Sequence, residues 1–118
     1  MLKIENLSHT YADGHRAIAD VQLQVEAGQL VSIVGPSGCG KSTLLRCIAG
    51  VVGPTGGQVD LEGTPISGVP DNMAVVFQDY SRSLFPWLSV RDNVALPLRR
   101  RGLDRAGRHA AAAEALEA

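Results

Sequence analysis

Residues 35–43 of this 118-residue chain read Gly35-Pro36-Ser37-Gly38-Cys39-Gly40-Lys41-Ser42-Thr43. This stretch matches the pattern G-x-x-x-x-G-K-[ST] of a phosphate-binding P-loop. It follows the apolar run Leu30–Val34, which predicts a strand buried on both faces. It opens the segment Lys41–Ala49, whose apolar residues recur at helical spacing. A glycine-rich loop between such a strand and a helix N-terminus predicts a site for phosphate groups.

The residue types in this loop explain the chemistry expected of it. Glycines let the backbone curl so that successive N–H groups point inward, and the helix N-terminus adds its positive dipole end. Lys41 supplies a compact charge for the β- and γ-phosphates, and Ser42 offers a hard oxygen ligand for Mg²⁺. A chance match in a chain this short is on the order of one in a few hundred, so an ordinary glycine-rich turn is the weaker alternative. We therefore predict that residues 35–43 bind ATP with Mg²⁺.

The amino-acid composition limits the classes of protein to which the chain can belong. Hydrophobic residues make up 45% of the chain, charged residues make up 19%, and the formal net charge is −1. These values are typical of a globular protein and give no general attraction to nucleic acid. No apolar run approaches the roughly 20 residues that span a bilayer, and the N-terminus has no signal-peptide pattern. We expect a cytosolic protein whose contact with a membrane would be peripheral.

The rest of the chain predicts an α/β fold. Apolar and polar residues alternate over Val21–Val25 after a turn at Asp13-Gly14, which indicates an antiparallel β-portion near the N-terminus. Met73–Phe77 is a second apolar run and predicts another buried strand. Ser89–Asp92 has capping-box spacing before a further helix. We expect a P-loop NTPase-type partial parallel sheet with helices, plus the antiparallel β-portion.

Further motifs narrow the class to a family. These motifs are Asn6-Leu7-Ser8 with Tyr11, Ala27-Gly28-Gln29, Val34–Leu45, Gly57-Gln58-Val59, Val76–Tyr80, Leu84–Val90 and Asn93-Val94. With them the chain resembles an ABC transporter ATP-binding subunit, and the stretch Tyr80–Trp87 is most similar to importers of the nitrate, sulfonate and taurine type.

The resemblance implies roles for residues outside the P-loop. Tyr11 matches the aromatic residue that stacks on adenine, although a strand-end tyrosine packed on the core is the alternative. Gln78 matches the glutamine that contacts Mg²⁺ or the attacking water, and Gln78 and Lys41 are the candidate catalytic residues. Alone, Gln78 would be an ordinary polar surface residue. The region Gln78–Val90 would receive a membrane permease subunit, although its aromatic residues could equally be core.

The resemblance also implies what is missing. The family's Leu-Ser-Gly-Gly-Gln motif, its acidic strand, its general-base glutamate and its switch histidine come later in the chain. Residues 1–118 therefore correspond to the N-terminal part of an ABC-type nucleotide-binding domain, without its catalytic half. The strand before the P-loop pairs, in the family, with the acidic strand, so Leu30–Val34 should keep an open apolar edge.

The expected function is that of the ATP-binding, energy-coupling subunit of an importer, at the cytoplasmic face of the membrane. The resemblance implies a homodimer of such subunits, and hydrolysis belongs to the complete domain. Whether this chain is itself an enzyme stays open. Two alternatives are a truncated nucleotide-binding fragment without catalytic activity and a soluble ABC-type ATPase acting on nucleic acid. The absence of a basic surface argues against the latter.

Overall fold

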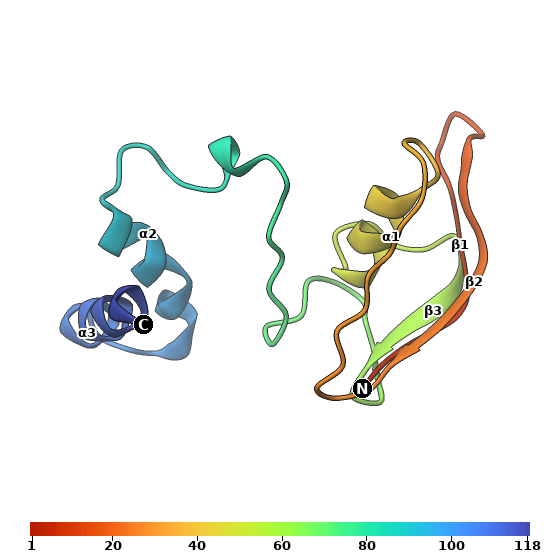
Figure 1. Ribbon diagram of the computed structural model, residues 1–118. Helices are drawn as coiled ribbons and strands as arrows, with labels where there is room; N and C mark the ends of the chain where they lie inside the picture. Colours follow the sequence, from red (N-terminus) through yellow and green to blue (C-terminus); the bar gives the residue numbers. More distant parts are fainter. The chain divides into compact units, whose positions relative to one another are not determined.

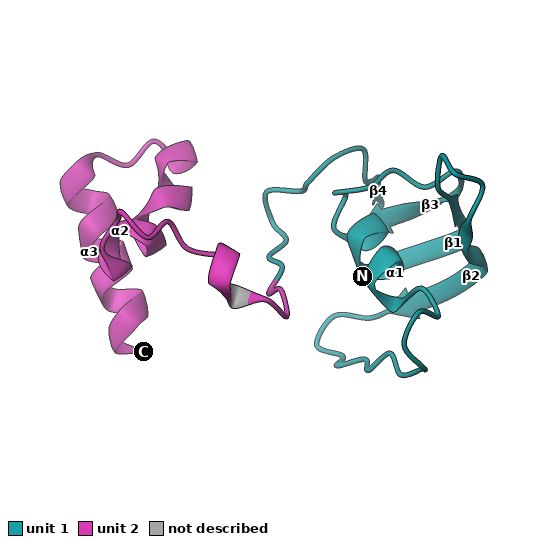
Figure 2. Cartoon of the chain, turned by 90° about the horizontal axis from the view of Figure 1, so that it is seen from above, with its two compact units in different colours: residues 1–75 teal, residues 76–118 magenta. Residues whose placement is uncertain are grey.

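The computed structural model describes residues 1–79 and 81–118, and Tyr80 lies outside the described residues. The chain divides into two compact units, Met1–Val75 and Val76–Ala118 (Figure 2). The first unit holds the antiparallel sheet and the P-loop, and the second holds short helices. Each unit is described by itself below.

A four-stranded sheet forms the frame of the first unit (Figure 1). Its strands are β1 (Leu2–Thr10), β2 (Arg16–Val25), β3 (Gly56–Leu61) and β4 (Thr64–Pro65). They lie in the order β2-β1-β3-β4, and each neighbouring pair is antiparallel. The turn at Asp13-Gly14 joins β1 to β2, so the antiparallel β-portion predicted from the sequence is confirmed.

The helix α1 (Lys41–Ile48) packs on this sheet and completes the core. It contributes Leu44 and Cys47, while Ile4, Leu7 and their sheet neighbours come from the strands. Leu7 is fully buried, and burying such a side chain contributes about 1.5–3 kcal/mol. The helix ends at Ile48, one residue before the expected Ala49, and Gly50 follows its C-cap with a φ of 69°. This packing fixes the first turn of α1, and therefore the P-loop, against β2.

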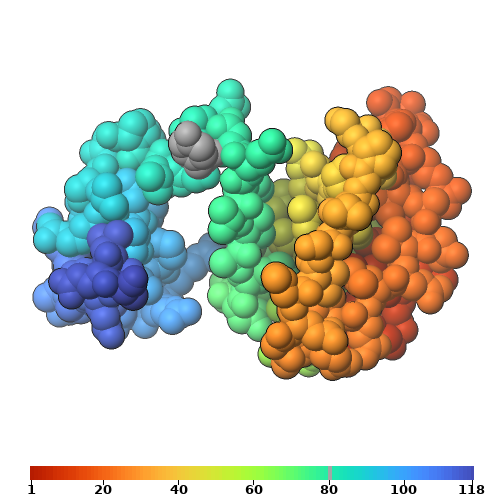
Figure 3. Space-filling model, in the orientation of Figure 1, coloured from red at the N-terminus to blue at the C-terminus, as the bar shows by residue number. Residues whose placement is uncertain are grey.

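Two predicted strands are not seen in the described part of the chain. Residues 30–34 and 73–77 lie outside every strand, so these two strand predictions are wrong, although the predicted combination of helices with an antiparallel β-portion is confirmed. Leu30 is 96% exposed and Val76 is 97% exposed, whereas both runs were expected to be buried. A strand needs a neighbour for its backbone N–H and C=O groups, and no described segment pairs with either run. The run 30–34 lies on the surface shown in orange in Figure 3.

Short helices make up the second unit. They are η1 (Tyr80–Arg82), α2 (Val90–Ala95), η2 (Leu96–Arg101) and α3 (Arg105–Glu117). Ser89 caps α2 by accepting from the Asp92 N–H at 3.1 Å, as the capping box predicts. The α-helix stops at Ala95, before Pro97, because proline cannot donate the next backbone bond. His109 Nε2 on α3 lies 3.0 Å from Asp92 Oδ1 on α2 and ties the two helices together.

Candidate nucleotide-binding site

The P-loop leads directly into α1, and glycine is required at the junction. Gly40 caps the helix with a φ of 101°, a conformation that side chains rarely adopt. A Cβ at Gly40 would lie 2.4 Å from the Ala17 carbonyl oxygen of β2. The loop therefore rests directly on the backbone of β2, and the helix N-terminus is held where phosphate groups would meet it.

Lys41 places its charge inside the curl of the loop. Its Nζ donates to the carbonyl oxygens of Gly35, at 2.6 Å, and Pro36, at 2.7 Å. Cys39 Sγ lies 3.6 Å from the same Nζ. The ammonium group thus already faces the concave side of the loop, where the β- and γ-phosphates are expected.

Thr43 connects the P-loop helix to the end of β1. Its side chain is buried, and its Oγ1 lies 2.8 Å from the hydroxyl of Tyr11. Tyr11 follows directly after β1 and is half-buried. The structure therefore brings Tyr11 together with the P-loop, as the predicted adenine-binding role requires. That role itself stays a prediction.

Two histidines flank the Tyr11 ring, and no role was predicted for either. The His9 ring meets it edge-on, with centroids 4.7 Å apart and an interplanar angle of 85°. His15 stacks nearly parallel to it at 6.4 Å and 14°.

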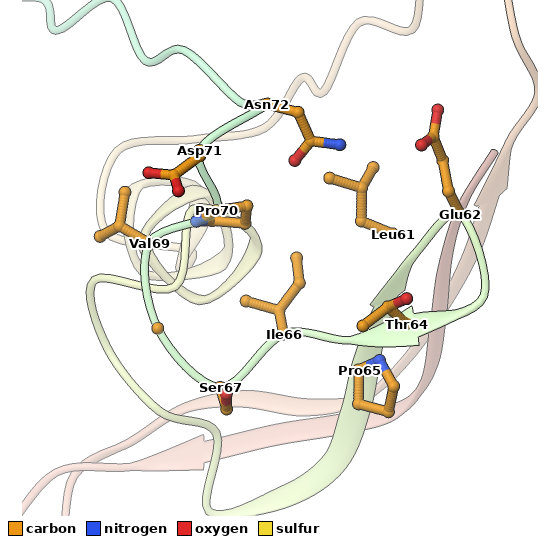
Figure 4. Close-up of a pocket in the computed structure, with 11 residues that line it drawn as sticks. Leu61, Glu62, Thr64, Pro65, Ile66, Ser67, Val69, Pro70, Asp71 and Asn72 are labelled. Carbon is orange, nitrogen blue, oxygen red and sulfur yellow. The ribbon is translucent and has the colours of Figure 1, made fainter. Parts of the chain in front are cut away.

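Two cavities of the first unit differ in their relation to the P-loop. One of about 250 Å³ is lined by Cys39, Gly40 and Lys41 together with apolar residues of β2 and α1. A larger one, of about 480 Å³, is lined by residues 61–72 (Figure 4). Its charged lining residues are Glu62 and Asp71, so this larger cavity is unsuited to a polyphosphate.

The side chains near the P-loop could hold Mg²⁺ only if the phosphates of a bound nucleotide supplied further ligands. Ser42 is exposed at the first turn of α1, where its hydroxyl can reach an ion. Among residues 1–79 and 81–118, no group of three or more His, Cys, Asp or Glu side chains could hold a metal. Mg²⁺ is usually held by one or two protein ligands and the substrate's phosphates, which suits Ser42. Gln78, the second predicted ligand, lies exposed at a bend in the second unit.

Comparison with known proteins identifies the family. The model of the ABC transporter family matches residues 18–118, so the chain belongs to this family. The chain is 44% identical over 108 residues to the sn-glycerol-3-phosphate import ATP-binding protein UgpC of Vibrio cholerae, and the match covers 89% of the chain and 28% of UgpC. It is 46% identical over 100 residues to the taurine import ATP-binding protein TauB of Burkholderia pseudomallei, covering 85% of the chain and 38% of TauB.

Solved structures agree on the fold. The ATP-binding cassette MJ0796, in a dimeric post-hydrolysis state bound to ADP and Pi, matches with a TM-score of 0.83 and 32% identity. This match covers 99% of the chain and 56% of MJ0796. The chain therefore spans well under two thirds of the length of the relatives it matches, and its fold is a portion of the ABC ATPase cassette.

Proposed function

We propose that this chain binds Mg-ATP as part of the energy-coupling subunit of an ABC importer. The observation that carries the proposal is the position of Lys41, whose ammonium group lies 2.6 Å from the Gly35 carbonyl inside the loop. Gly35–Thr43 would hold the phosphates, Ser42 the Mg²⁺, and Tyr11 the adenine ring. Bound Mg²⁺ would neutralise phosphate charge, while Gln78 would orient the attacking water in a complete domain.

The two lysines of the chain provide a direct test of ATP binding. Lys41→Ala removes the charge from the loop, so we expect it to weaken binding of a fluorescent ATP analogue by about 2–4 kcal/mol. The matched control is Lys3→Ala, because Lys3 is the other lysine and pairs with Glu5 at 2.6 Å on β1. Equal affinity in the Lys41→Ala and Lys3→Ala variants would contradict the P-loop assignment.

The segment Phe85–Ser89 is the proposed docking surface for a membrane permease. Trp87 is 75% exposed, and its ring lies 5.0 Å from that of Phe85. Asn93 closes this loop, since its Oδ1 accepts from the Phe85 N–H at 2.8 Å and its Nδ2 donates to the Ser89 carbonyl at 3.0 Å. An exposed aromatic pair on a loop held in this way is suited to binding an apolar helix of a partner.

Docking is tested by co-purification of the complete subunit with its permease. Trp87→Ala should reduce recovery of the permease by about tenfold, because truncating an interface aromatic commonly costs 1–2 kcal/mol. ATP binding by the same variant should be unchanged. Undiminished recovery with Trp87→Ala would place the permease contact elsewhere.

The importer subtype and the location belong to the same proposal. Similarity to a taurine import protein supports the nitrate, sulfonate and taurine importer subtype. None of the helices in the described ranges is long and apolar enough to cross a membrane. We place the subunit peripherally at the cytoplasmic face, as one of a pair. Failure of the complete protein to restore sulfonate or taurine uptake in a strain lacking such a subunit would contradict the subtype.

A further inference from the structure

His9 is a buried histidine on β1 that the proposed function does not use. It is only 7% exposed, and its Nδ1 lies 3.1 Å from the carbonyl oxygen of Gly53. A carbonyl only accepts hydrogen bonds, so Nδ1 carries a proton and donates it to Gly53. Nε2 is buried and has no hydrogen-bond partner among the described residues.

The unpartnered Nε2 makes histidine a costly choice at this position. A buried polar atom without a partner destabilises the fold, and Leu or Val would fill a buried strand position without that cost. Native proteins leave few such atoms unsatisfied, and each calls for an explanation. Two contacts distinguish the His9 ring from an aliphatic side chain: its hydrogen bond to the Gly53 carbonyl and its edge-on contact with Tyr11.

The contacts of Tyr11 are of two kinds, buried and exposed. On the buried side, His9 meets the ring edge-on at 4.7 Å, and the Tyr11 hydroxyl lies 2.8 Å from Thr43 Oγ1. On the outer side, the exposed His15 stacks at 6.4 Å. His9 itself is anchored by Gly53, in the loop after α1. The Tyr11 ring is therefore held between the P-loop helix and an anchored aromatic edge.

We infer that His9 is a positioning residue. It holds the Tyr11 ring in the orientation that stacks on the nucleotide base, and so contributes to base binding without touching the nucleotide. This inference rests on the proposed function, because it assumes that Tyr11 meets adenine. Edge-to-face aromatic contacts are favoured by ring electrostatics, and the Thr43 contact fixes the other end of the ring. His9 thereby links base binding to the core of the sheet, while the phosphates are held by the loop alone.

Two substitutions separate the ring of His9 from its hydrogen bond. His9→Asn keeps an N–H group for the Gly53 carbonyl and removes the ring. His9→Phe keeps the ring against Tyr11 and removes the N–H group. Binding of Mg-ATP and of inorganic tripolyphosphate is measured for the parent chain and both variants, because tripolyphosphate has no base. Ile4→Val, a change at another buried position of β1, serves as a control for loss of stability alone.

We expect His9→Asn to weaken Mg-ATP binding by about threefold to tenfold, with tripolyphosphate binding within about twofold of the parent. His9→Phe should bind Mg-ATP like the parent. The effect of His9→Asn should vanish in a Tyr11→Ala background, because a positioning residue acts only through the residue it positions.

Three results would overturn the inference. The first is that His9→Asn weakens the binding of Mg-ATP and of tripolyphosphate equally, and the second is that His9→Phe weakens Mg-ATP binding as much as His9→Asn does. The third is that His9→Asn still weakens Mg-ATP binding in the Tyr11→Ala background. If His9→Asn does not fold, His9→Phe decides the question, since normal Mg-ATP binding supports the ring contact and weakened binding opposes it. A parent chain that binds neither ligand would instead refute the proposed function.

Discussion

At the residue scale, two glycines of the P-loop should respond differently to the same substitution. Both have a positive φ, 81° at Gly38 and 101° at Gly40. A Cβ at Gly38 would meet nothing within 4 Å, whereas a Cβ at Gly40 would lie 2.4 Å from the Ala17 carbonyl oxygen. Gly38→Ala should therefore cost only the free energy of placing alanine in a left-handed conformation. Gly40→Ala should cost this free energy and, in addition, that of a clash with the Ala17 backbone of β2.

We expect Gly38→Ala to lower the free energy of unfolding by about 1–2 kcal/mol, the usual cost of a left-handed alanine. Gly40→Ala should lower it by at least about 2 kcal/mol more, because the loop must lift from β2. Thermal unfolding of the parent and both variants measures the difference. Equal melting temperatures for the two variants would show that Gly40 does not rest on Ala17.

At the element scale, the junction of α2 and α3 should be sensitive to acid. The hydrogen bond from the Ser89 hydroxyl lowers the pKa of Asp92, and the nearby charges of His109 and Arg91 lower it further. A carboxylate with a depressed folded-state pKa stabilises the fold above its unfolded-state pKa, near 3.9. That contribution is lost as the pH falls from there through the lower folded-state pKa.

We therefore expect amide exchange in α2 to accelerate as the pH falls below about 4, beyond the change that intrinsic exchange rates predict. Asp92→Asn should remove this additional acid sensitivity, because the charge is then absent at every pH. Glu5→Gln provides the matched control, since Glu5 also has a lowered pKa but pairs with Lys3 in the first unit. Identical acid profiles for α2 in the parent and Asp92→Asn would contradict the assigned role.

The elements differ in how well the sequence predicted them. The Asp13-Gly14 turn, the capping box at Ser89–Asp92 and the start of α1 at Lys41 were predicted because their signals lie within a few residues. Residues 30–34 and 73–77 were predicted wrongly as buried strands, because strand formation depends on a neighbour that a local pattern cannot supply. The contacts of His9 were missed for a related reason, since Gly53 lies 44 residues away in the chain.

At the scale of the whole molecule, the two units carry different parts of the predicted site. Tyr11 and the P-loop belong to Met1–Val75, and Gln78 and the aromatic loop belong to Val76–Ala118. Sequence motifs predict site residues in both units. The mutual placement of the units is a property that local motifs do not contain, so the role of Gln78 at the phosphates stays a prediction.

The division of the site bears on what residues 1–118 can do alone. The proposed nucleotide binding depends on local geometry, since the Lys41 contacts, the helix N-terminus and the Tyr11–Thr43 contact all lie within the first unit. Hydrolysis depends on more: a water aligned on the γ-phosphate, a carboxylate to orient or deprotonate it, and charge stabilisation around the transferred group. The matched cassette MJ0796 is longer, since the chain covers 56% of it, and its post-hydrolysis state is dimeric.

We predict that the 118-residue polypeptide by itself binds Mg-ATP weakly and turns it over no faster than its Lys41→Ala variant. Gln78 is the proposed contact of the attacking water, and neither Asp71 nor Asp79, the acidic residues near it in the sequence, follows a strand. Phosphate release is measured for both proteins after removal of contaminating ATPases, with binding of a fluorescent ATP analogue followed in the same preparations. Release clearly above the Lys41→Ala level would mean that residues 1–118 contain a hydrolytic group of their own.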